Sequence, residues 1–303
     1  MSGPSFRTGP AHVRVPASSA NLGPGFDSLG LALSLCDDVV AQVVGSGLGV
    51  EVEGQGADRV PRTEQHLVVR AMRAAFEALG GQPPGLRVSC LNRVPHDRGL
   101  GSSATAIVSG LVAARALVVG GDLALDDAAV LALAAELEGH PDNVAACLLG
   151  GLTVAWQEAD GARAVSMRPA AALAPVVFVP DTRSSTVTAR GALPATVPHV
   201  DAAWNAGRAA LLVYALTQDP GLLLSATEDR LHQPYRAPAI PASAQLVHRL
   251  RADRVPAVVS GAGPTVLAFP DPGADLSRYT TPGWDVLELA VDNMGAVLVP
   301  TAG

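Results

Sequence analysis

Residues 94–106 read Val-Pro-His-Asp-Arg-Gly-Leu-Gly-Ser-Ser-Ala-Thr-Ala, and they join a predicted strand to a predicted helix. Before them, in residues 86–90, apolar and polar side chains alternate, which is typical of a strand. After them, apolar residues recur at intervals of three and four, which is typical of one helix face. The glycines and serines therefore form a turn at the N-terminus of a helix.

This turn is suited to binding an anion. The first N–H groups of a helix lack intrahelical partners, and the helix dipole favours negative charge there. Gly99 and Gly101 have no side chain, so a phosphate can approach the backbone closely. An ordinary strand-turn-helix with a serine cap is the alternative, and two glycines alone would not exclude it.

The longer pattern is more specific, because Pro95 precedes the run Gly-Leu-Gly-Ser-Ser-Ala at 99–104. It resembles the phosphate loop of the GHMP kinases, a superfamily that includes galactokinases, homoserine kinases and mevalonate kinases. The resemblance implies that ATP phosphates bind to this loop. The residues it assigns to phosphate binding are Pro95, Arg98, Gly99, Leu100, Gly101, Ser102, Ser103 and Ala104.

The composition favours a folded protein without a nucleic-acid partner. The chain has 303 residues, enough for two domains, and is 49% hydrophobic and 16% charged. Its net charge of −7, without a basic run, gives nucleic-acid binding little support. No signal-peptide core and no membrane-spanning run are present, and the three cysteines lie far apart, so we expect a cytoplasmic protein with reduced thiols.

All 21 basic residues are arginines, because the sequence contains no lysine. A Walker A loop, a protein kinase and a pyridoxal enzyme each need a lysine, so these three classes are disfavoured. Any side-chain cation that binds a phosphate or carboxylate must be arginine or protonated histidine.

Residues 18–27 resemble the Ser-Ser-Ala-Asn-Leu-Gly-x-Gly-Phe-Asp motif of the homoserine kinases, although an ordinary surface turn is the alternative. In that family the Asn and the Asp help to hold the amino-acid substrate, which implies this role for Asn21 and Asp27. A carboxylate can pair with a substrate ammonium group, and a carboxamide can bind its polar groups.

Three later segments match the same family. His140 and Asn143 belong to a His-x-x-Asn-Val-Ala run, and the resemblance places both in the substrate site. Thr186 and Arg190 match a Thr-x-x-Ala-Arg pattern, so Arg190 is a candidate for a substrate carboxylate or a γ-phosphate. Arg236 ends a Pro-Tyr-Arg element and is a candidate for a bidentate contact with the α-carboxylate.

The resemblance also implies a Mg²⁺ ion held by a loop serine and a nearby glutamate. We assign these to Ser103 and Glu138, with Glu136 as the alternative because this sequence is shorter here than some homoserine kinases. Both glutamates lie in the last turn of a predicted helix that Asp126 caps. Acids there oppose the helix dipole, which costs a few tenths of a kcal/mol up to ~1 kcal/mol each.

Asn143 stands where mevalonate kinases and galactokinases place a carboxylate base. We therefore expect no strong protein base, and we expect Asn143 and Arg190 to act by positioning and charge stabilisation. A role for Asp142 stays open. His66 lies at the start of a helix that we expect Thr63 to cap, where relatives often carry Asn near the adenine, and we interpret it as a surface or capping residue.

The resemblance implies an α+β fold with two domains: a ribosomal S5 domain 2-like domain at residues 1–158 and a ferredoxin-like domain at 159–303. Residues 159–174 are Ala-rich and are expected to link them. It implies ATP- and Mg²⁺-dependent phosphorylation of the side-chain hydroxyl of L-homoserine in threonine biosynthesis, and it allows a homodimer. The alternatives are a GHMP kinase of another small hydroxy acid and an inactive nucleotide-binding relative.

Overall fold

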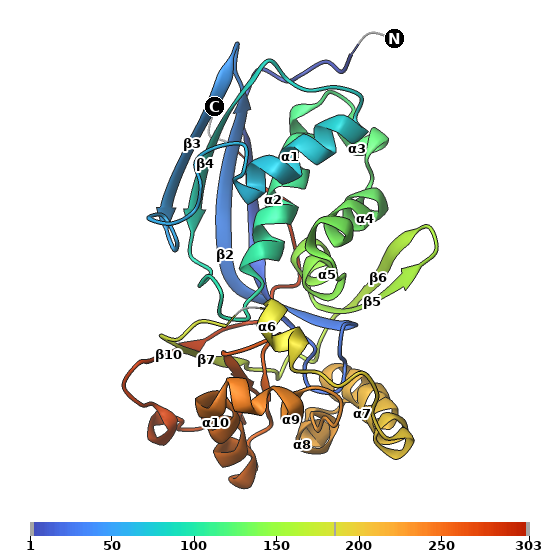
Figure 1. Ribbon diagram of the computed structural model, residues 1–303, viewed down its shortest axis with the longest axis vertical. Helices are drawn as coiled ribbons and strands as arrows, with labels where there is room; N and C mark the ends of the chain where they lie inside the picture. The colour runs from blue at the N-terminus through green and yellow to red at the C-terminus, as the bar shows by residue number, and fades with distance from the viewer. Residues whose placement is uncertain (1–2, 185, 301–303) are drawn as a thin grey trace.

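A computed structural model describes residues 3–184 and 186–300, without the side chains of 186–188. The chain forms two lobes, with the N-terminal half above and the segment from β7 to β10 below (Figure 1). The strands of the first lobe are β1 Ala11–Ala20, β2 Leu29–Val43, β3 Gly47–Gly54, β4 Gly85–Asn92, β5 Leu152–Glu158, β6 Gly161–Met167 and β11 Val297–Leu298. Its helices are α1 Leu67–Ala78, α2 Ser102–Leu117, α3 Gly121–Ala124, α4 Asp127–Glu138 and α5 Asp142–Leu149.

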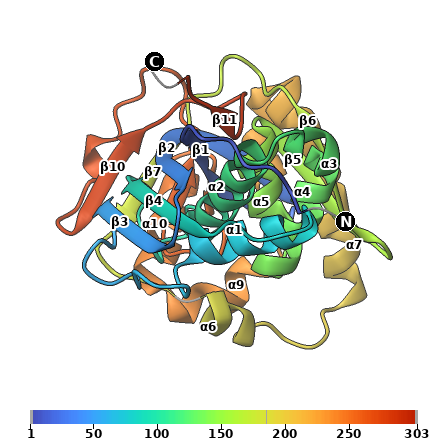
Figure 2. The same ribbon diagram turned by 90° about the horizontal axis from the view of Figure 1, so that it is seen from above.

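The described strands of the first lobe form one seven-stranded sheet in the order β11-β1-β2-β4-β3, with β5 and β6 branching from β2. The β3–β4 pair is parallel, because α1 carries the chain between the two strands. The β1–β2 register shifts after Pro16, so that Pro16 faces Cys36 and Ala17 faces Leu33. Helices α1, α2, α4 and α5 gather beside this sheet, as the view from above shows (Figure 2).

The second lobe has a four-stranded antiparallel sheet in the order β10-β7-β9-β8. Its strands are β7 Val176–Pro180, β8 Ala257–Val259, β9 Val266–Ala268 and β10 Trp284–Glu288. Its helices are α6 Thr186–Gly191, α7 His199–Thr217, α8 Leu223–Ala226, α9 Gln233–Arg236 and α10 Pro241–Ala252. Short 3-10 turns occur at Pro220–Leu222, Ala237–Ala239 and Ser277–Tyr279.

A shared core joins the lobes. One face of β7 contributes Val176 and Phe178 to a core with α10, whereas Val177 and Val179 point to the other face. On that face they join a cluster that includes Leu100 of the first lobe and helices α7 and α8. Because the cluster draws apolar side chains from both lobes, it fixes the position of the loops between them.

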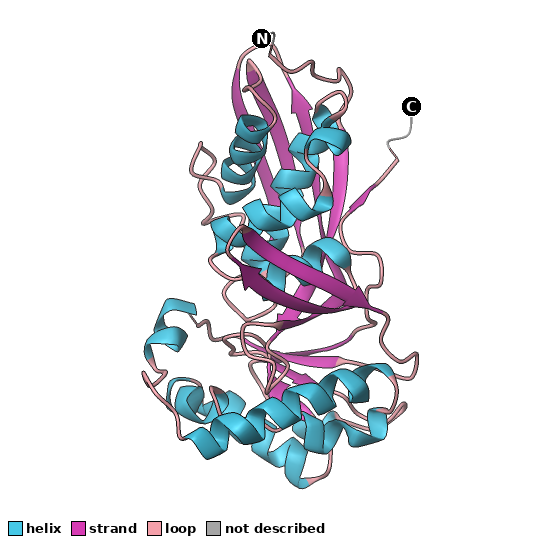
Figure 3. Cartoon of the chain, turned by 90° about the vertical axis from the view of Figure 1, so that its right-hand side faces the viewer, coloured by secondary structure: helices cyan, strands magenta, loops and turns pink. Residues whose placement is uncertain are grey.

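Several sequence expectations about elements are corrected. Residues 159–174, expected as a link, contain β6, which pairs with β5 along its whole length and forms the hairpin in front of the first lobe in Figure 3. The division at residue 158 stays a prediction; it falls between these two paired strands. Helix α1 begins at Leu67, so His66 rather than Thr63 is its N-cap. The capping of α4 by Asp126 is confirmed, since Asp126 accepts a hydrogen bond from the N–H of Ala129.

Candidate active site

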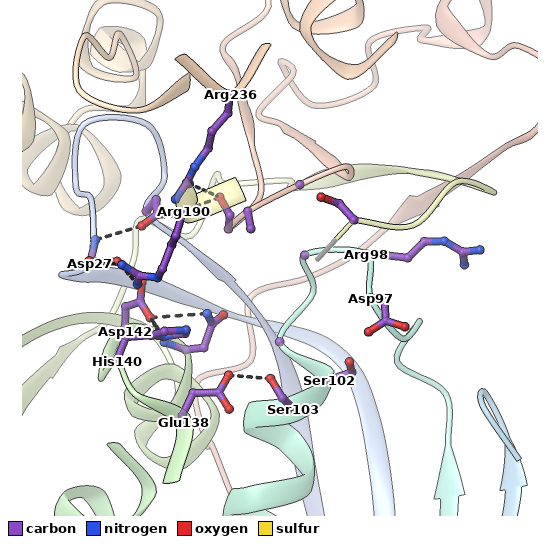
Figure 4. Close-up of a pocket in the computed structure, with 18 of the residues that line it drawn as sticks. Asp27, Asp97, Arg98, Ser102, Ser103, Glu138, His140, Asp142, Arg190 and Arg236 are labelled. Carbon is purple, nitrogen blue, oxygen red and sulfur yellow. Dashed lines mark hydrogen bonds and ion pairs between the residues drawn. The ribbon is translucent and has the colours of Figure 1, made fainter. Parts of the chain in front are cut away.

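A cavity of about 560 Å³ lies at the N-terminus of α2, and residues of both lobes line it (Figure 4). The lining residues are Asn21, Asp27, Asp97, Arg98, Gly99, Gly101, Ser102, Ser103, Glu138, His140, Asp142, Asn143, Arg183, Ser184, Arg190, Arg236, Gly261, Ala262 and Gly263. Twelve of the residues that the sequence nominates are among them, although they span more than 200 positions of the chain.

The turn before α2 requires its two glycines. Gly99 has φ +78° and Gly101 has φ +72°, a region in which residues with a Cβ are strained. A Cβ on Gly99 would also overlap the carbonyl oxygen of Ser260, and one on Gly101 would overlap the hydroxyl of Ser18. The backbone therefore reaches a conformation that brings the first turn of α2 to the cavity wall.

The first turn of α2 offers backbone donors to the cavity. Gly101 is the N-cap and has no side chain that could bind them. The first N–H that bonds within the helix is that of Thr105, which donates to the carbonyl of Gly101. Within the described part of the chain, no acceptor binds the N–H groups of residues 102–104. This end of α2 therefore has the geometry of an anion-binding site.

A second glycine-rich loop, at 260–265, packs against the turn. The hydroxyl of Ser260 donates to the carbonyl of Gly99 at 2.6 Å, and the N–H of Thr265 donates to the carbonyl of Arg98 at 3.2 Å. The side-chain amide of Asn21 donates to the carbonyl of Gly261 at 2.9 Å. These bonds connect both lobes at the cavity rim.

Ser103 and Glu138 meet across the cavity floor. The hydroxyl of Ser103 donates to Oε1 of Glu138 at 2.5 Å. Burial raises the pKa of Glu138, and the Ser103 hydrogen bond partly offsets that effect. Glu136 is exposed and lines a separate groove beside the β5–β6 hairpin, so of the two glutamates only Glu138 faces the turn before α2.

Asn21 fixes the conformation of Asp27. Asp27 has φ +54°, and its N–H donates to Oδ1 of Asn21 at 2.9 Å. Since the amide nitrogen of Asn21 binds Gly261, both ends of this amide are bound by the protein. The structure therefore gives Asn21 a supporting position, with the Asp27 carboxylate extending into the cavity.

Asp27 forms a two-bond ion pair with Arg190 of α6. The guanidinium nitrogens of Arg190 donate to the two carboxylate oxygens at 3.0 and 2.7 Å, and both side chains are between a third and two fifths exposed. The hydrogen bond to Asp27 raises the pKa of Arg190. The two groups that the sequence assigns to opposite charges of a substrate thus bind each other.

Arg236 reaches the same region from α9 and is almost fully buried, at 2% exposure. Its Nε donates to the carbonyl of Ala189 at 3.1 Å, and its Nη1 donates to Nδ1 of His232 at 3.2 Å and to the carbonyl of Gly261 at 3.4 Å. Burial and the nearby charge of Arg190 lower the pKa of Arg236.

The start of α5 holds a linked set of polar side chains. Oδ1 of Asp142 accepts hydrogen bonds from Nδ1 of His140 at 2.8 Å and from the N–H of Asn143 at 2.7 Å. Burial acts to lower the pKa of His140, but the hydrogen bond and charge of Asp142 raise it overall. Oδ1 of Asn143 accepts from the hydroxyl of Ser18 at 2.9 Å, which orients the amide.

The other nominated residues are placed differently. Arg98 donates to the carbonyls of Asp181 and Thr182, so it ties the loop to the segment before α6. Pro95, Leu100 and Ala104 are buried beneath the turn rather than lining the cavity. The side chain of Thr186 lies outside what the structure describes. Asp97 and Ser184 line the cavity although the sequence did not single them out, and Arg183 and Gly261–Gly263 line it as well.

A smaller cavity of about 220 Å³ adjoins the first and shares Asp97, Ser102 and Ser103 with it. Its other lining residues are Asp37, Val39, Val60, Pro61, Gln65, His66, Leu67, Val68, Asn92, His96, Ala106 and Ser109. Nδ1 of His66 and the hydroxyl of Ser109 are buried without a hydrogen-bond partner among the described atoms. His66 is therefore a buried cavity residue rather than a surface one, and its N-cap position makes no side-chain capping bond.

Comparison with known proteins identifies the family. Residues 66–151 match the model of the GHMP kinases N-terminal domain. The chain is 60% identical to a homoserine kinase of Streptomyces avermitilis over 304 aligned residues, with all of both chains covered. It is 52% identical to a homoserine kinase of Mycobacterium tuberculosis, covering 86% of this chain and 84% of that one.

The chain belongs to the homoserine kinases of the GHMP family. Membership in this family confirms the resemblance seen in its motifs and implies the use of ATP.

Solved structures agree on the fold. A structure described as a putative homoserine kinase from Listeria monocytogenes has a TM-score of 0.76 at 29% identity, with 96% of this chain and all of that one covered. A homoserine kinase from Cytophaga hutchinsonii has a TM-score of 0.83 at 24% identity, covering 99% and 100%, and supports the fold alone. The predicted α+β GHMP kinase fold is confirmed.

Proposed function

We propose that this cavity transfers the γ-phosphoryl group of ATP to the side-chain hydroxyl of L-homoserine. The observation that carries the proposal is the meeting of an anion-binding helix N-terminus with the Asp27 carboxylate and the guanidinium groups of Arg190 and Arg236 in a single cavity. L-Homoserine has one ammonium and one carboxylate, and its reacting hydroxyl lies two carbons from the carbon that bears them. Such charges select an amino acid rather than a neutral sugar or a hydroxy acid.

ATP spans the two adjoining cavities in this proposal. The N–H groups at the start of α2 bind the phosphates, and the apolar walls of the smaller cavity bind the base. His66 and Ser109 support this position of the base, because each has a buried polar atom that lacks a partner among the described atoms. A purine edge can supply the missing hydrogen bonds.

Ser103 and Glu138 would hold Mg²⁺. They fit that ion, because Mg²⁺ takes oxygen ligands and is usually bound by one or two carboxylates together with phosphate oxygens and water. When bound, the ion neutralises charge on the transferring phosphates.

The substrate groups follow the charges of the cavity. Asp27 binds the ammonium group, and Arg190 and Arg236 bind the carboxylate or the γ-phosphate. A zwitterionic substrate can replace the Asp27–Arg190 ion pair. Its ammonium group then takes the place of the Arg190 guanidinium at Asp27, and its carboxylate takes the place of the Asp27 carboxylate at Arg190. Asn21 supports Asp27, and His140 completes the substrate site among the described residues.

Asn143 positions the reacting hydroxyl. Its Oδ1 is bound by Ser18, so its amide nitrogen is the end that can donate to the hydroxyl oxygen. The hydroxyl oxygen then bonds to the γ-phosphorus, the bond from that phosphorus to the ADP oxygen breaks, and the hydroxyl proton passes to water. Phosphoryl transfer needs positioning and charge stabilisation more than a strong base.

The location and assembly of the protein are also proposed. A cytoplasmic location is supported by Cys36, Cys90 and Cys147, which are free thiols. No helix in the described parts of the chain has both the length and the apolar character needed to cross a bilayer. A homodimer is a proposal from the family alone.

The proposed function is tested by measuring ADP release in the presence of ATP and Mg²⁺ with five candidate substrates: L-homoserine, L-serine, D-homoserine, mevalonate and galactose. Two analogues sharpen it: 4-hydroxybutanoate lacks the ammonium group, and 3-amino-1-propanol lacks the carboxylate. We expect selective turnover of L-homoserine and large losses with both analogues. Equal turnover of 4-hydroxybutanoate, or selective turnover of mevalonate, would refute the amino-acid site and retain the nucleotide site.

A further inference from the structure

His232 is a buried histidine next to the cavity, outside the set of residues proposed above to touch substrate. Its side chain is 0% exposed and lies at the N-cap of α9, one turn before Arg236. One ring nitrogen, Nε2, is 2.7 Å from the carbonyl oxygen of Gly23. The other, Nδ1, is 3.2 Å from Nη1 of Arg236.

These two contacts define the tautomer. A carbonyl oxygen only accepts, so Nε2 must carry the proton and donate to Gly23. A guanidinium group only donates, so Nδ1 must present its lone pair to Arg236. The ring is therefore neutral, with an N–H toward the loop at 21–27 and an acceptor toward α9. Burial lowers the pKa of His232, which favours this neutral form.

The charges around the ring act in both directions. The charge of Arg236 opposes protonation of the ring, whereas the carboxylates of Asp229 and Asp27 favour it. Asp229 lies 3.6 Å from Nε2, but its carboxylate accepts the backbone N–H groups of residues 231–233 and so caps the start of α9. The geometry decides for the neutral ring, because a protonated ring would place a cation against the Arg236 guanidinium and would remove the acceptor for Arg236.

Phe26 completes the arrangement. Its ring stacks on the imidazole of His232 with 5.1 Å between centroids, and the guanidinium carbons of Arg236 and Arg190 lie 5.2 and 5.7 Å from its centroid. The ring face favours cations and covers the imidazole. The imidazole thus links the loop that carries Asp27 to the helix that carries Arg236.

We propose that His232 is a positioning residue that sets the orientation of Arg236 toward the substrate carboxylate and couples it to the Asp27 loop. Ala189, His232 and Gly261 bind Nε and Nη1 of Arg236, and no described atom binds its Nη2. With these three bonds made by Nε and Nη1, Nη2 is the donor left for a ligand. The proposal rests on the proposed function, because it concerns the binding of an amino-acid carboxylate.

Two substitutions of His232 each keep one of its two hydrogen bonds and remove the other. In His232→Asn the amide oxygen can take the place of Nδ1 and accept from Arg236, whereas in His232→Gln the amide nitrogen can take the place of Nε2 and donate to Gly23. We expect KM for L-homoserine to rise tenfold or more in His232→Gln, because the hydrogen bond to the charged Arg236 guanidinium is lost. In His232→Asn that bond is kept, so KM should rise about threefold or less. KM for ATP should change less than about twofold in both.

The carboxylate-free analogue gives the specific readout. For 3-amino-1-propanol, kcat/KM should be nearly equal in wild type and His232→Gln, since no carboxylate is present for Arg236 to bind. His12→Gln is the control, because His12 binds Asp38 at 2.8 Å in the first sheet, far in sequence from α9, and should leave KM unchanged. Equal KM values for L-homoserine in wild type and His232→Gln, or equal losses for both substrates, would overturn the proposal.

Nitrogen NMR of the wild-type protein tests the tautomer without any turnover. We expect His232 to show a protonated Nε2 and an unprotonated Nδ1 at neutral pH, and Nδ1 to shift in Arg236→Gln. A protonated Nδ1 would refute the proposed bond to Arg236 whatever the enzyme's activity. Failure of wild type to phosphorylate L-homoserine, with the expected nitrogen signals present, would instead refute the proposed function alone.

Discussion

The hydroxyl of Ser103 in the first turn of α2 lies 2.5 Å from Oε1 of Glu138 at the end of α4. The two residues are 35 positions apart, and the contact between α2 and α4 brings them together. Burial raises the pKa of Glu138, so the ionised carboxylate at this position lowers the stability of the folded protein. The proposed Mg²⁺ site would account for this unfavourable placement, and the pair supports several predictions about activity and stability.

Glu138→Gln should lower kcat at least about 100-fold, because the neutral amide cannot replace a carboxylate that holds a divalent cation. It should leave the melting temperature unchanged or higher at neutral pH. The sign follows from the raised pKa of Glu138: the folded state favours the protonated form, so stability is lost as pH rises through the folded value. Steady-state kinetics and thermal melts measure both effects.

Glu136→Gln is the matched control, since Glu136 is exposed and faces another groove. It should keep kcat within about twofold of wild type. A large loss in Glu136→Gln with normal turnover in Glu138→Gln would reverse the assignment of the two glutamates.

Asp27→Asn should reduce kcat/KM for L-homoserine by roughly 10- to 100-fold, because one charged hydrogen-bond acceptor for the ammonium group is lost. The ratio of kcat/KM for L-homoserine over 4-hydroxybutanoate should shrink by a similar factor. The melting temperature should change little, since the Asp27–Arg190 pair is partly exposed and such pairs contribute less than about 1 kcal/mol. An unchanged substrate ratio would contradict the ammonium contact.

Gly101→Ala should raise KM for ATP and destabilise the fold by about 1–2 kcal/mol or more. The strain of a Cβ at φ +72° accounts for the stability cost, and its overlap with Ser18 displaces the loop. Gly120→Ala is a close control: Gly120 also has φ +72° and is the N-cap of α3, but nothing lies within 4 Å of an added Cβ. It should cost stability and leave KM for ATP unchanged.

Asp142→Asn should lower the pKa of His140, because the hydrogen bond and charge of Asp142 are what raise it against burial. In wild type the contribution of this pair to stability is complete below the unfolded pKa of histidine and is lost as pH rises through the higher folded value. In Asp142→Asn, stability should not fall in this way as pH rises through that range. Titration of the His140 ring by NMR and urea unfolding across the same pH range test the two statements; an unchanged midpoint would contradict them.

Much of the site could be predicted because its motifs are local. The run at 99–104 combines glycines that accept positive φ with a helix start, so its conformation depends mainly on nearby residues. Asp126 and Gly139 similarly mark the two ends of α4, because caps act on adjacent backbone groups. Family resemblance then supplied the roles of Asp27, Arg190 and Arg236.

Residues whose role depends on distant partners could not be predicted in this way. His66 was interpreted as a surface or capping residue, but tertiary packing buries it in the smaller cavity. The alternation within 161–167 was too short to reveal β6, which is held by its pairing with β5. His232 bonds to Gly23, 209 positions away, so no local pattern could indicate that contact.

By itself the sequence determined the local conformations and the kinds of charge available: glycine turns, helix ends, carboxylates, and arginines as the only permanently charged side-chain cations. Only the tertiary structure decided which of these groups meet. Glu138 rather than Glu136 faces Ser103, Asp27 pairs with Arg190, and Arg236 rests on His232. The physical reason is that backbone propensities act over a few residues, whereas these contacts depend on the packing of two lobes around a shared core.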